Sequence, residues 1–358
     1  MRIAFDVSPL SHEALGIGNY IRGSLEGLVE AAAGRHEIVA FAPTSLRGPG
    51  RIRAALAGID VELRLWPLPA SHALRTLWSR LGRPSAERLI GRVDVLHFSD
   101  WMYPSQAAGV RATTIHDLVP LHFPDWCTAR TISMHTHKFE NAARTCDLVF
   151  VNSAYTGRDV EATLRVPPER VRVAHPGVRT IFRPDGPSAE LGRPFALTVA
   201  TLEPRKNLGA LLEAHALLAD ELELVVVGAE GWGEQPLLER PGVRRLGFVP
   251  DDELARLYRG ASVLVYPSRF EGFGIPVVEA MASGTPVVAS SHPSLDEACG
   301  EAAVRVDPED PGAIADGIRR ALTERDRLSA LGLDHASTFS WRASGEIFLT
   351  AFEEAVAA

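Results

Sequence analysis

The stretch YPSRFEGFGIPVVE, residues 266–279, contains both the end of an expected strand and the beginning of an expected helix. The apolar run that ends at Tyr266 predicts a buried strand. Pro276 predicts the first turn of a helix, where its missing N–H costs little. Between them lie Gly272 and Gly274, which allow a ligand to approach the backbone closely. The free N–H groups of such a helix start favour an anionic or oxygen-rich ligand.

Two carboxylates belong to the same stretch. Glu271 and Glu279 have seven residues between them, and Glu279 falls about one turn into the expected helix. Carboxylates beside a pocket that favours phosphate are suited to the hydroxyl groups of a sugar. The alternative is a glycine-rich connection with two solvated glutamates.

Outward from this stretch, short apolar runs alternate with helical patterns, which indicates a parallel α/β sheet. Several runs are apolar on both faces, as strands covered on both sides must be. Two such series are joined by the turn-rich segment 182–187, so we expect two doubly wound domains facing each other across a cleft. The strand runs are 2–7, 37–41, 61–65, 93–98, 112–116, 148–151, 195–201, 222–227, 243–246, 262–266, 286–289 and 303–306.

Composition narrows the function classes. The 358 residues are 46% apolar and 23% charged, which is typical of a soluble globular protein and excludes a disordered chain. Three scattered cysteines exclude a disulfide scaffold and fit a reducing, cytoplasmic compartment. The net charge of −8 argues against nucleic acid as a partner. We find neither a run of about 18 apolar residues nor a secretory signal.

Arg205 and Lys206 lie between the end of one strand and the start of a helix. There an arginine can grip phosphate in a fork while a lysine acts as a point charge, so the pair is suited to a departing diphosphate. Cations oppose the helix dipole at this position, so we expect an anion to offset them. The alternative is a solvated pair.

Two further segments are weaker signals. Gly16 and Gly18 follow the first strand in an expected loop, with a helix from Asn19, but the third glycine of a dinucleotide fingerprint would fall at Ile21. A simple turn is the alternative. His116 ends a strand, where doubly wound sheets face their ligands, or is satisfied locally by its neighbour Asp117.

The Glu271–Glu279 spacing within FEGFGIPVVEAMASGTPVVAS resembles the signature of retaining glycosyltransferase family 4, which has the GT-B fold. Residues 294–303 resemble the downstream loop of that family, 201–208 its donor-phosphate segment and 16–20 its diphosphate loop. One departure is Ala200-Thr201, because many members have an arginine there.

The resemblance implies a retaining, metal-independent transfer of a sugar from a nucleotide-diphosphate donor by front-face attack. It implies domains at 1–180 and 181–340, with residues 341–358 as a helix that packs back on the N-terminal domain. Glu279 would bind the donor ribose, and Glu271 sugar hydroxyls. The EPRKN segment resembles bacterial mannosyltransferases, which favours GDP-mannose. The implied catalytic residues are Arg205, Lys206, Glu271 and His116, and the implied donor-binding residues are Gly16, Gly18, Gly272, Phe273, Gly274, Ile275 and Glu279.

The acceptor remains open between a glycan, a lipid-linked compound and a small molecule. Residues 45–94 hold nine arginines against four acidic residues, and an apolar stripe beside arginines within 71–92 would suit an anionic bilayer. The alternative is that the stripe, Leu74, Leu77, Trp78 and Leu81, faces the core and the arginines are solvated. Rival functions are a GT-B-like sugar-nucleotide epimerase and a non-catalytic sugar-nucleotide binding module.

Overall fold

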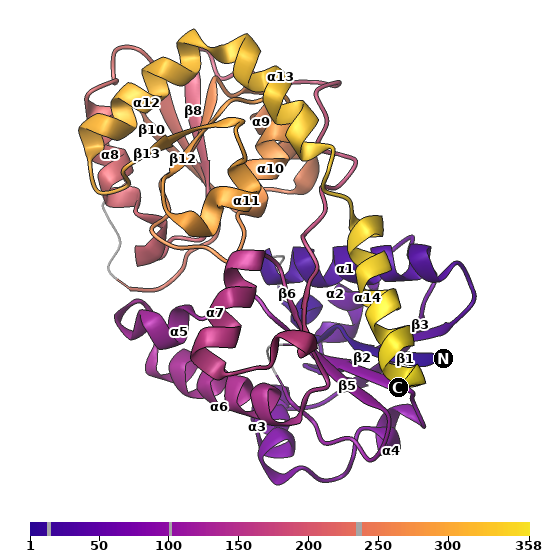
Figure 1. Ribbon diagram of the computed structural model, residues 1–358. Coiled ribbons are helices and arrows are strands. Elements are labelled where there is room, and N and C mark those ends of the chain that lie inside the picture. The colour runs from indigo at the N-terminus through magenta and orange to yellow at the C-terminus, as the bar shows by residue number, and fades with distance from the viewer. Residues whose placement is uncertain (13–15, 100–101, 234–237) are drawn as a thin grey trace. The chain divides into compact units, whose positions relative to one another are not determined.

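The computed structural model describes residues 1–12, 16–99, 102–233 and 238–358 (Figure 1). The chain forms two compact units, each with its own parallel sheet. Unit 1 comprises Met1–His122, Ala129–Gly177 and Ser340–Ala358, and unit 2 comprises Phe123–Thr128 and Val178–Phe339.

Within the described part of unit 1, seven strands form a sheet in the order β3-β2-β1-β4-β5-β6-β7, and every pairing is parallel. The strands are β1 Arg2–Asp6, β2 Glu37–Thr44, β3 Glu62–Pro67, β4 Val95–Phe98, β5 Val110–Ile115, β6 Leu148–Val151 and β7 Val171–Val173. The helices are α1 Gly16–Ala32, α2 Gly48–Ala55, α3 Ser71–Leu81, α4 Glu87–Ile90, α5 Val119–His122, α6 Ala129–Thr145, α7 Ala154–Leu164 and α14 Trp341–Ala357.

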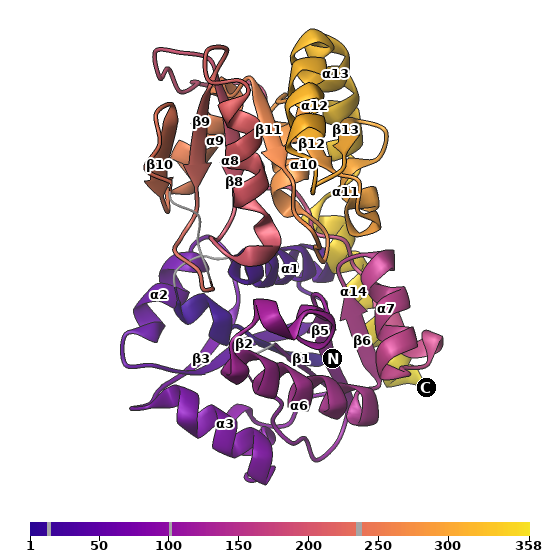
Figure 2. The same cartoon turned by 90° about the vertical axis from the view of Figure 1, so that its left-hand side faces the viewer.

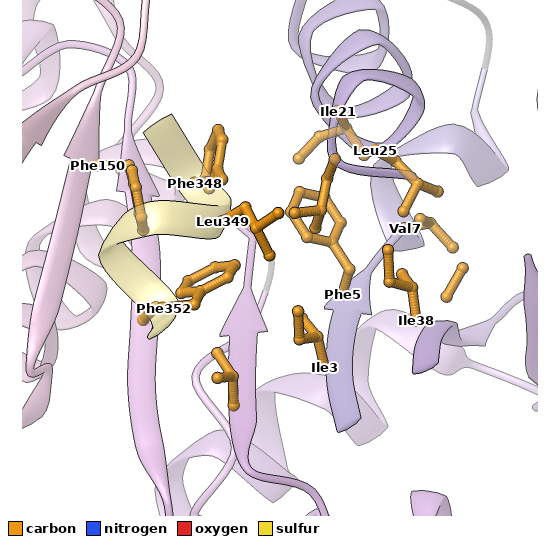
Figure 3. Packing of buried hydrophobic residues seen from close by; sticks show 14 of the residues in the cluster. Ile3, Phe5, Val7, Ile21, Leu25, Ile38, Phe150, Phe348, Leu349 and Phe352 are labelled. Carbon is orange, nitrogen blue, oxygen red and sulfur yellow. The ribbon is translucent and has the colours of Figure 1, made fainter. Parts of the chain in front are cut away.

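The last helix, α14, completes the core of unit 1 beside α1 (Figure 1). Figure 3 shows Phe348, Leu349 and Phe352 directed from α14 toward the sheet. The ring of Phe348 stacks on Phe150 of β6 with centroids 4.0 Å apart, and it meets Phe5 of β1 edge-on. Aromatic residues from opposite ends of the chain are therefore buried together in one cluster.

Within the described part of unit 2, six strands form a second parallel sheet in the order β10-β9-β8-β11-β12-β13 (Figure 2). The strands are β8 Phe195–Val199, β9 Glu223–Val227, β10 Val243–Gly247, β11 Val263–Tyr266, β12 Val287–Ser290 and β13 Ala303–Val306. The helices are α8 Leu208–Ala216, α9 Asp251–Gly260, α10 Ile275–Ala282, α11 Asp296–Cys299, α12 Pro311–Thr323 and α13 Arg325–Ala336.

Both faces of the second sheet are covered by helices, which explains the continuous apolar runs of its central strands β9 and β11. Along β9, Val225 and Val227 enter one hydrophobic cluster, and Leu224 and Val226 enter the cluster on the opposite face. Successive side chains of a strand point to opposite faces, so a strand between two helical layers must be apolar throughout. The predicted α/β class, with two doubly wound parallel sheets, is confirmed.

Three local predictions are wrong. Gly16 and Gly18 lie in the first turn of α1 rather than in a loop, because the buried face of this helix extends back to Gly18. Asn19 is consequently inside the helix and does not begin it. Residues 182–187 were expected to join the two domains, but unit 2 already begins at Val178, and Phe182 is buried against the ring of Tyr258. The short strand β7 was also missed.

Candidate functional site

The residues that the sequence singled out in unit 2 lie at the carboxyl ends of two neighbouring strands. Arg205 and Lys206 belong to the short 3₁₀ helix η4, Pro204–Lys206, which follows β8. Glu271 follows β11, which pairs directly with β8. Both strands run in the same direction, so their following loops meet at one edge of the sheet, where doubly wound sheets bind ligands.

Four charged side chains meet at this edge, and we call them the η4 cluster: Glu203, Arg205, Lys206 and Glu271. The Lys206 ammonium lies 2.5 Å from one Glu271 oxygen, and the Arg205 guanidinium lies 2.7 Å from the other. Arg205 also pairs with Glu203 at 2.7 Å. Lys206 donates a further hydrogen bond of 2.8 Å to the hydroxyl of Tyr266, the last residue of β11.

The η4 cluster is buried and electrically balanced. The exposed fraction is 7% for Lys206 and 5% for Glu271. Burial alone would raise the pKa of Glu271, but the charges of Arg205 and Lys206 lower it to about 2. Burial and the Arg205 charge lower the pKa of Lys206, against the attraction of Glu271. Two cations and two carboxylates thus leave no net charge.

This arrangement excludes the solvated alternatives for both Arg205–Lys206 and Glu271. The anion expected beside the two cations is supplied by the protein itself, from Glu271 and Glu203. Glu203 belongs to the EPRKN segment, but no role was predicted for it. Glu203 lies two residues before Arg205, in the loop that follows β8, and this closeness to Arg205 could have indicated an ion pair.

Glu279 occupies a separate buried position on α10. Its carboxylate accepts a hydrogen bond of 3.1 Å from the hydroxyl of Tyr258, which lies on α9. Burial raises the pKa of Glu279 to about 7, although the Tyr258 hydrogen bond and the Arg179 charge oppose the rise. Glu279 therefore titrates near neutral pH, in contrast to Glu271. The pattern of the sequence contained no signal for Tyr258.

The loop before α10 is tightly packed. Gly274 has a φ of 107°, and a Cβ there would lie 2.6 Å from the Leu295 side chain, so no other residue fits without a shift. Phe273 is buried against the ring of Phe339, with centroids 5.3 Å apart. The backbone N–H of Glu271 donates to the hydroxyl of Ser294, 3.0 Å away. Gly272 lies in the same loop, and Ile275 is the first residue of α10.

The remaining singled-out residues lie in unit 1. His116 follows β5, and its ring meets the ring of Tyr20 edge-on, with centroids 4.8 Å apart. Asp117 accepts a hydrogen bond of 3.0 Å from the backbone N–H of Val119, so its carboxylate caps the turn that follows. Gly16 and Gly18 lie on α1, in the first turn of a helix, whose N–H groups have no partners within the helix.

Comparison with known families identifies both halves. The model of Glycosyltransferase Family 4 matches residues 16–181, and the model of Glycosyl transferases group 1 matches residues 183–333. The chain belongs to the family 4, group 1 glycosyltransferases. Among the described residues of this glycosyltransferase, no group of three or more His, Cys, Asp and Glu side chains is arranged to hold a metal ion.

Individual glycosyltransferases resemble the chain from end to end. The O-antigen chain mannosyltransferase B of Escherichia coli is 28% identical over 381 residues, covering 95% of this chain and 96% of its own. Sucrose-phosphate synthase from Thermosynechococcus elongatus shares the fold with a TM-score of 0.73 and 20% identity, covering 100% and 99% of the two chains. Anabaena HepE in complex with UDP-glucose shares the fold with a TM-score of 0.72 and 16% identity, and the match covers 99% of this chain and 100% of HepE.

Proposed function

We propose that this glycosyltransferase moves a mannosyl residue from GDP-mannose to a hydroxyl group of an acceptor, with retention of configuration and without a metal ion. The single observation that carries the proposal is the η4 cluster, in which a buried lysine and a partly buried arginine lie at the carboxyl edge of a doubly wound sheet. The choice of donor draws on the full-length similarity to a mannosyltransferase. The UDP-glucose in the complex of HepE makes a uridine nucleotide the rival donor.

In this proposal Arg205 and Lys206 stabilise the negative charge that builds on the departing diphosphate. Glu271 has two tasks: it binds a hydroxyl of the donor sugar, and its charge keeps the buried Lys206 protonated while the site is empty. When the diphosphate binds, Arg205 and Lys206 already face the negative charge of Glu271, and the diphosphate either replaces this carboxylate as their partner or binds beside it. Arginine is the better partner for a phosphate fork, and lysine the better point charge.

The chemistry of Glu271 supports front-face attack rather than a covalent intermediate. A carboxylate whose pKa is about 2 is a poor proton acceptor near neutral pH. It is also held by two cations, which reduces its strength as a nucleophile. We therefore assign the acceptor proton to a phosphate oxygen of the leaving group. His116 contacts the donor sugar, and the first turn of α1, with Gly16 and Gly18, contacts the diphosphate.

Glu279 and the start of α10 bind the rest of the donor. The Glu279 carboxylate already accepts from Tyr258 and has a second oxygen for a ribose hydroxyl. The backbone N–H groups of 272–275, at the start of an eight-residue helix, bind sugar hydroxyls. These assignments carry over the roles that the family resemblance implied.

Nucleotide selectivity tests the proposal directly. We expect GDP to raise the thermal unfolding temperature more than UDP or dTDP at equal concentration, because ligands stabilise the state that they bind. Lys206→Met keeps the apolar stem and removes the charge, so it should abolish the GDP shift. Arg320→Gln, which breaks an exposed pair between α12 and Glu324, is the matched control and should retain the shift. A shift with UDP alone would overturn the choice of donor.

Product analysis tests the reaction. With GDP-mannose and an acceptor, transfer should continue in EDTA, and NMR of the product should show the anomeric configuration of the donor. Conversion of the donor to an epimeric nucleotide sugar without an acceptor would instead indicate an epimerase. Unchanged transfer by Lys206→Met would contradict the role of this lysine.

We also propose that α3 contacts an anionic bilayer. The leucines of α3 are exposed, by 41% for Leu74, 52% for Leu77 and 64% for Leu81, whereas Arg75 is buried. The alternative, in which the leucines face the core and the arginines are solvated, is therefore wrong for these leucines and for Arg75. No helix in the described residues is long and apolar enough to span a membrane.

A further inference from the structure

The helices α3 and α6 both belong to unit 1 (Figures 1 and 2). A cavity of about 440 Å³ lies between them, and we call it the α3–α6 cavity. Its size is within the range of small-molecule sites. It is separate from the η4 cluster, which belongs to unit 2. The cavity is lined by His72, Ala73, Thr76, Leu77, Ser79, Arg80, Tyr103, Arg130, Ser133, Met134 and His137.

The charged groups of this lining are cationic. Arg80 and Arg130 carry this charge, two histidines add ring nitrogens, and among the lining residues that the structure describes there is no aspartate or glutamate. The pKa of His72 is lowered by burial and by the charges of Arg130 and Arg75. The pKa of His12 nearby is lowered by burial and by Arg75, Arg51 and His72. The positive charges of Arg75 and Arg130 thus oppose a further positive charge here, so His72 is neutral near neutral pH.

The positions of these cations make the repulsion costly. Arg130 lies in the first turn of α6, where the helix dipole disfavours positive charge, and the neutral His72 lies in the first turn of α3. At the η4 cluster the same problem is solved by Glu203 and Glu271. Within the described ranges, Arg80 and Arg130 form no ion pair that plays this part. An anionic ligand would relieve both the repulsion and the dipole conflict.

The location also favours a ligand. The α3 helix follows β3, and η1, Ser8–Ser11, which leads to His12, follows β1. Both connections leave the carboxyl edge of the unit 1 sheet, the edge at which doubly wound sheets bind ligands. The apolar part of the lining comes from Leu77, Met134 and the Tyr103 ring, so the cavity offers an apolar wall beside its cations.

We propose that the α3–α6 cavity binds a phosphate ester of an apolar alcohol, with the phosphate against His72 and Arg130 and the apolar chain along Leu77 and Met134. This inference goes beyond the proposed function: an alkyl phosphate has no free hydroxyl group that could accept the sugar, so the ester is a ligand of unit 1 and not the sugar acceptor. Arg80 completes the cationic lining. Charge selects the phosphate head, and the apolar wall selects the alcohol.

Calorimetric titration with three probes tests the inference: decyl phosphate below its micelle concentration, decanol and inorganic phosphate. Decyl phosphate should bind at least about tenfold more tightly than either of the others, because only it uses both parts of the cavity. Arg130→Gln should weaken decyl phosphate about tenfold. Arg144→Gln is the matched control, because it removes the same exposed charge from the last turn of the same helix.

A second variant separates the two parts of the site. Leu77→Asn should weaken decyl phosphate and leave inorganic phosphate unchanged. Equal losses in Arg130→Gln and Arg144→Gln would reduce the effect to general electrostatics and overturn the inference. Equal binding of decyl phosphate and inorganic phosphate, or of decyl phosphate and decanol, would overturn it as well.

These titrations require no sugar transfer, so the two proposals fail independently. If GDP shifts the unfolding temperature and transfer occurs but decyl phosphate does not bind, only the cavity assignment is wrong. If decyl phosphate binds through Arg130 but no nucleotide binds, the donor assignment is wrong. Arg130→Gln should leave the GDP shift unchanged in either case, because its side chain lies outside the η4 cluster.

Discussion

Lys206 and Glu271 form a buried ion pair whose partners depend on each other. Removal of one partner leaves a charge without compensation in a region that excludes water, which typically costs about 3–5 kcal/mol. Without Lys206, Glu271 keeps its pair with Arg205, and without Glu271, Lys206 keeps the attraction of Glu203. The free energy lost should therefore lie toward the lower end of that range.

A double-mutant cycle measures this dependence. We expect Lys206→Met and Glu271→Gln each to lower the free energy of unfolding by about 3 kcal/mol, and the double variant to lose at least about 1 kcal/mol less than their sum. Glu309→Gln is the control, because it breaks an exposed pair and should cost less than about 1 kcal/mol. Urea unfolding provides the values, and strict additivity would contradict the coupling.

The two glutamates of the signature should give stability opposite dependences on pH. Glu279 has a folded pKa of about 7 against an ordinary value of 4.5, so the unfolded chain loses its proton first and stability falls as pH rises from 4.5 to 7. Glu271 has a folded pKa of about 2, so its contribution is present above pH 4.5 and is lost as pH falls toward 2.

Stability measured between pH 5 and 8 tests the Glu279 part. The linkage predicts a fall of about 3 kcal/mol for this group across the interval. Glu279→Gln cannot ionise, so the slope between pH 5 and 7 should flatten in that variant alone. Glu309→Gln should retain the slope, and an unchanged slope in Glu279→Gln would show that the raised pKa is not the cause.

For single residues, the sequence was a good guide to which side chains belong to the site, but a poor guide to which of them form pairs. Arg205, Lys206 and Glu271 were selected from strand ends and helix starts, and these three do meet. Glu203 and Tyr258 were not selected, because their roles depend on contacts between separate elements. Glu271 was expected to be available for sugar hydroxyls, and its pairing with two cations required knowledge of which strands are neighbours.

At the scale of elements, α3 shows the limit of periodic patterns. The spacing of its residues predicts an amphipathic helix. Because the leucines and the arginines both recur with the helical period, the period does not decide which of the two sets is buried. The structure buries Arg75, which donates to the Pro43 carbonyl 3.5 Å away, and exposes the leucines. Hydrophobicity alone predicts the reverse, so the orientation depended on a polar contact with the neighbouring strand.

The α1–α14 interface is built on glycines rather than on large side chains. A Cβ at Gly27 would lie 1.8 Å from the Trp341 carbonyl oxygen, and one at Gly23 would lie 2.1 Å from the Trp341 ring. A Cβ at Gly345 of α14 would lie 2.0 Å from the backbone of Gly27. Glycine weakens a helix by about 1 kcal/mol, so these positions are explained by the close approach that they allow.

We therefore expect Gly27→Ala to lower the free energy of unfolding by about 1–3 kcal/mol, because the two helices must separate or strain. Gly50→Ala is the matched control: it is an exposed helical glycine in α2 with no atom within 4 Å of an added Cβ. That variant should gain about 0.5–1 kcal/mol from helix propensity. Denaturant unfolding of both compares them, and a gain for both would show that the interface adapts without cost.

At the scale of the whole chain, the two βα series and the class of each sheet could be predicted, because period and turn residues are local signals. The membership of α14 in unit 1 entered the analysis through the family resemblance, since no local pattern relates Phe348 to Phe5. The inclusion of residues 123–128 in unit 2 was not foreseen. It depends on contacts such as the Phe123 and Phe270 rings, with centroids 5.4 Å apart.

The distribution of charge leads to the last prediction. The chain carries −8, yet residues 45–94 hold nine arginines against four acidic residues, and the exposed leucines of α3 lie in this basic segment. A basic segment with exposed leucines is attracted to anionic lipid and can insert apolar side chains, whereas the acidic remainder is repelled. Association should therefore require both anionic lipid and the leucines.

Flotation with vesicles separates these requirements. In low salt the protein should float with vesicles that contain phosphatidylglycerol, fail to float with pure phosphatidylcholine, and be released by about 0.5 M salt, which screens the attraction. Leu74→Ser/Leu81→Ser should reduce flotation severalfold without altering the α3–α6 cavity lining. Leu217→Ser/Leu331→Ser removes two exposed leucines of unit 2 and should float normally. If both double variants float alike, α3 is not the contact, and the exposed leucines need another explanation.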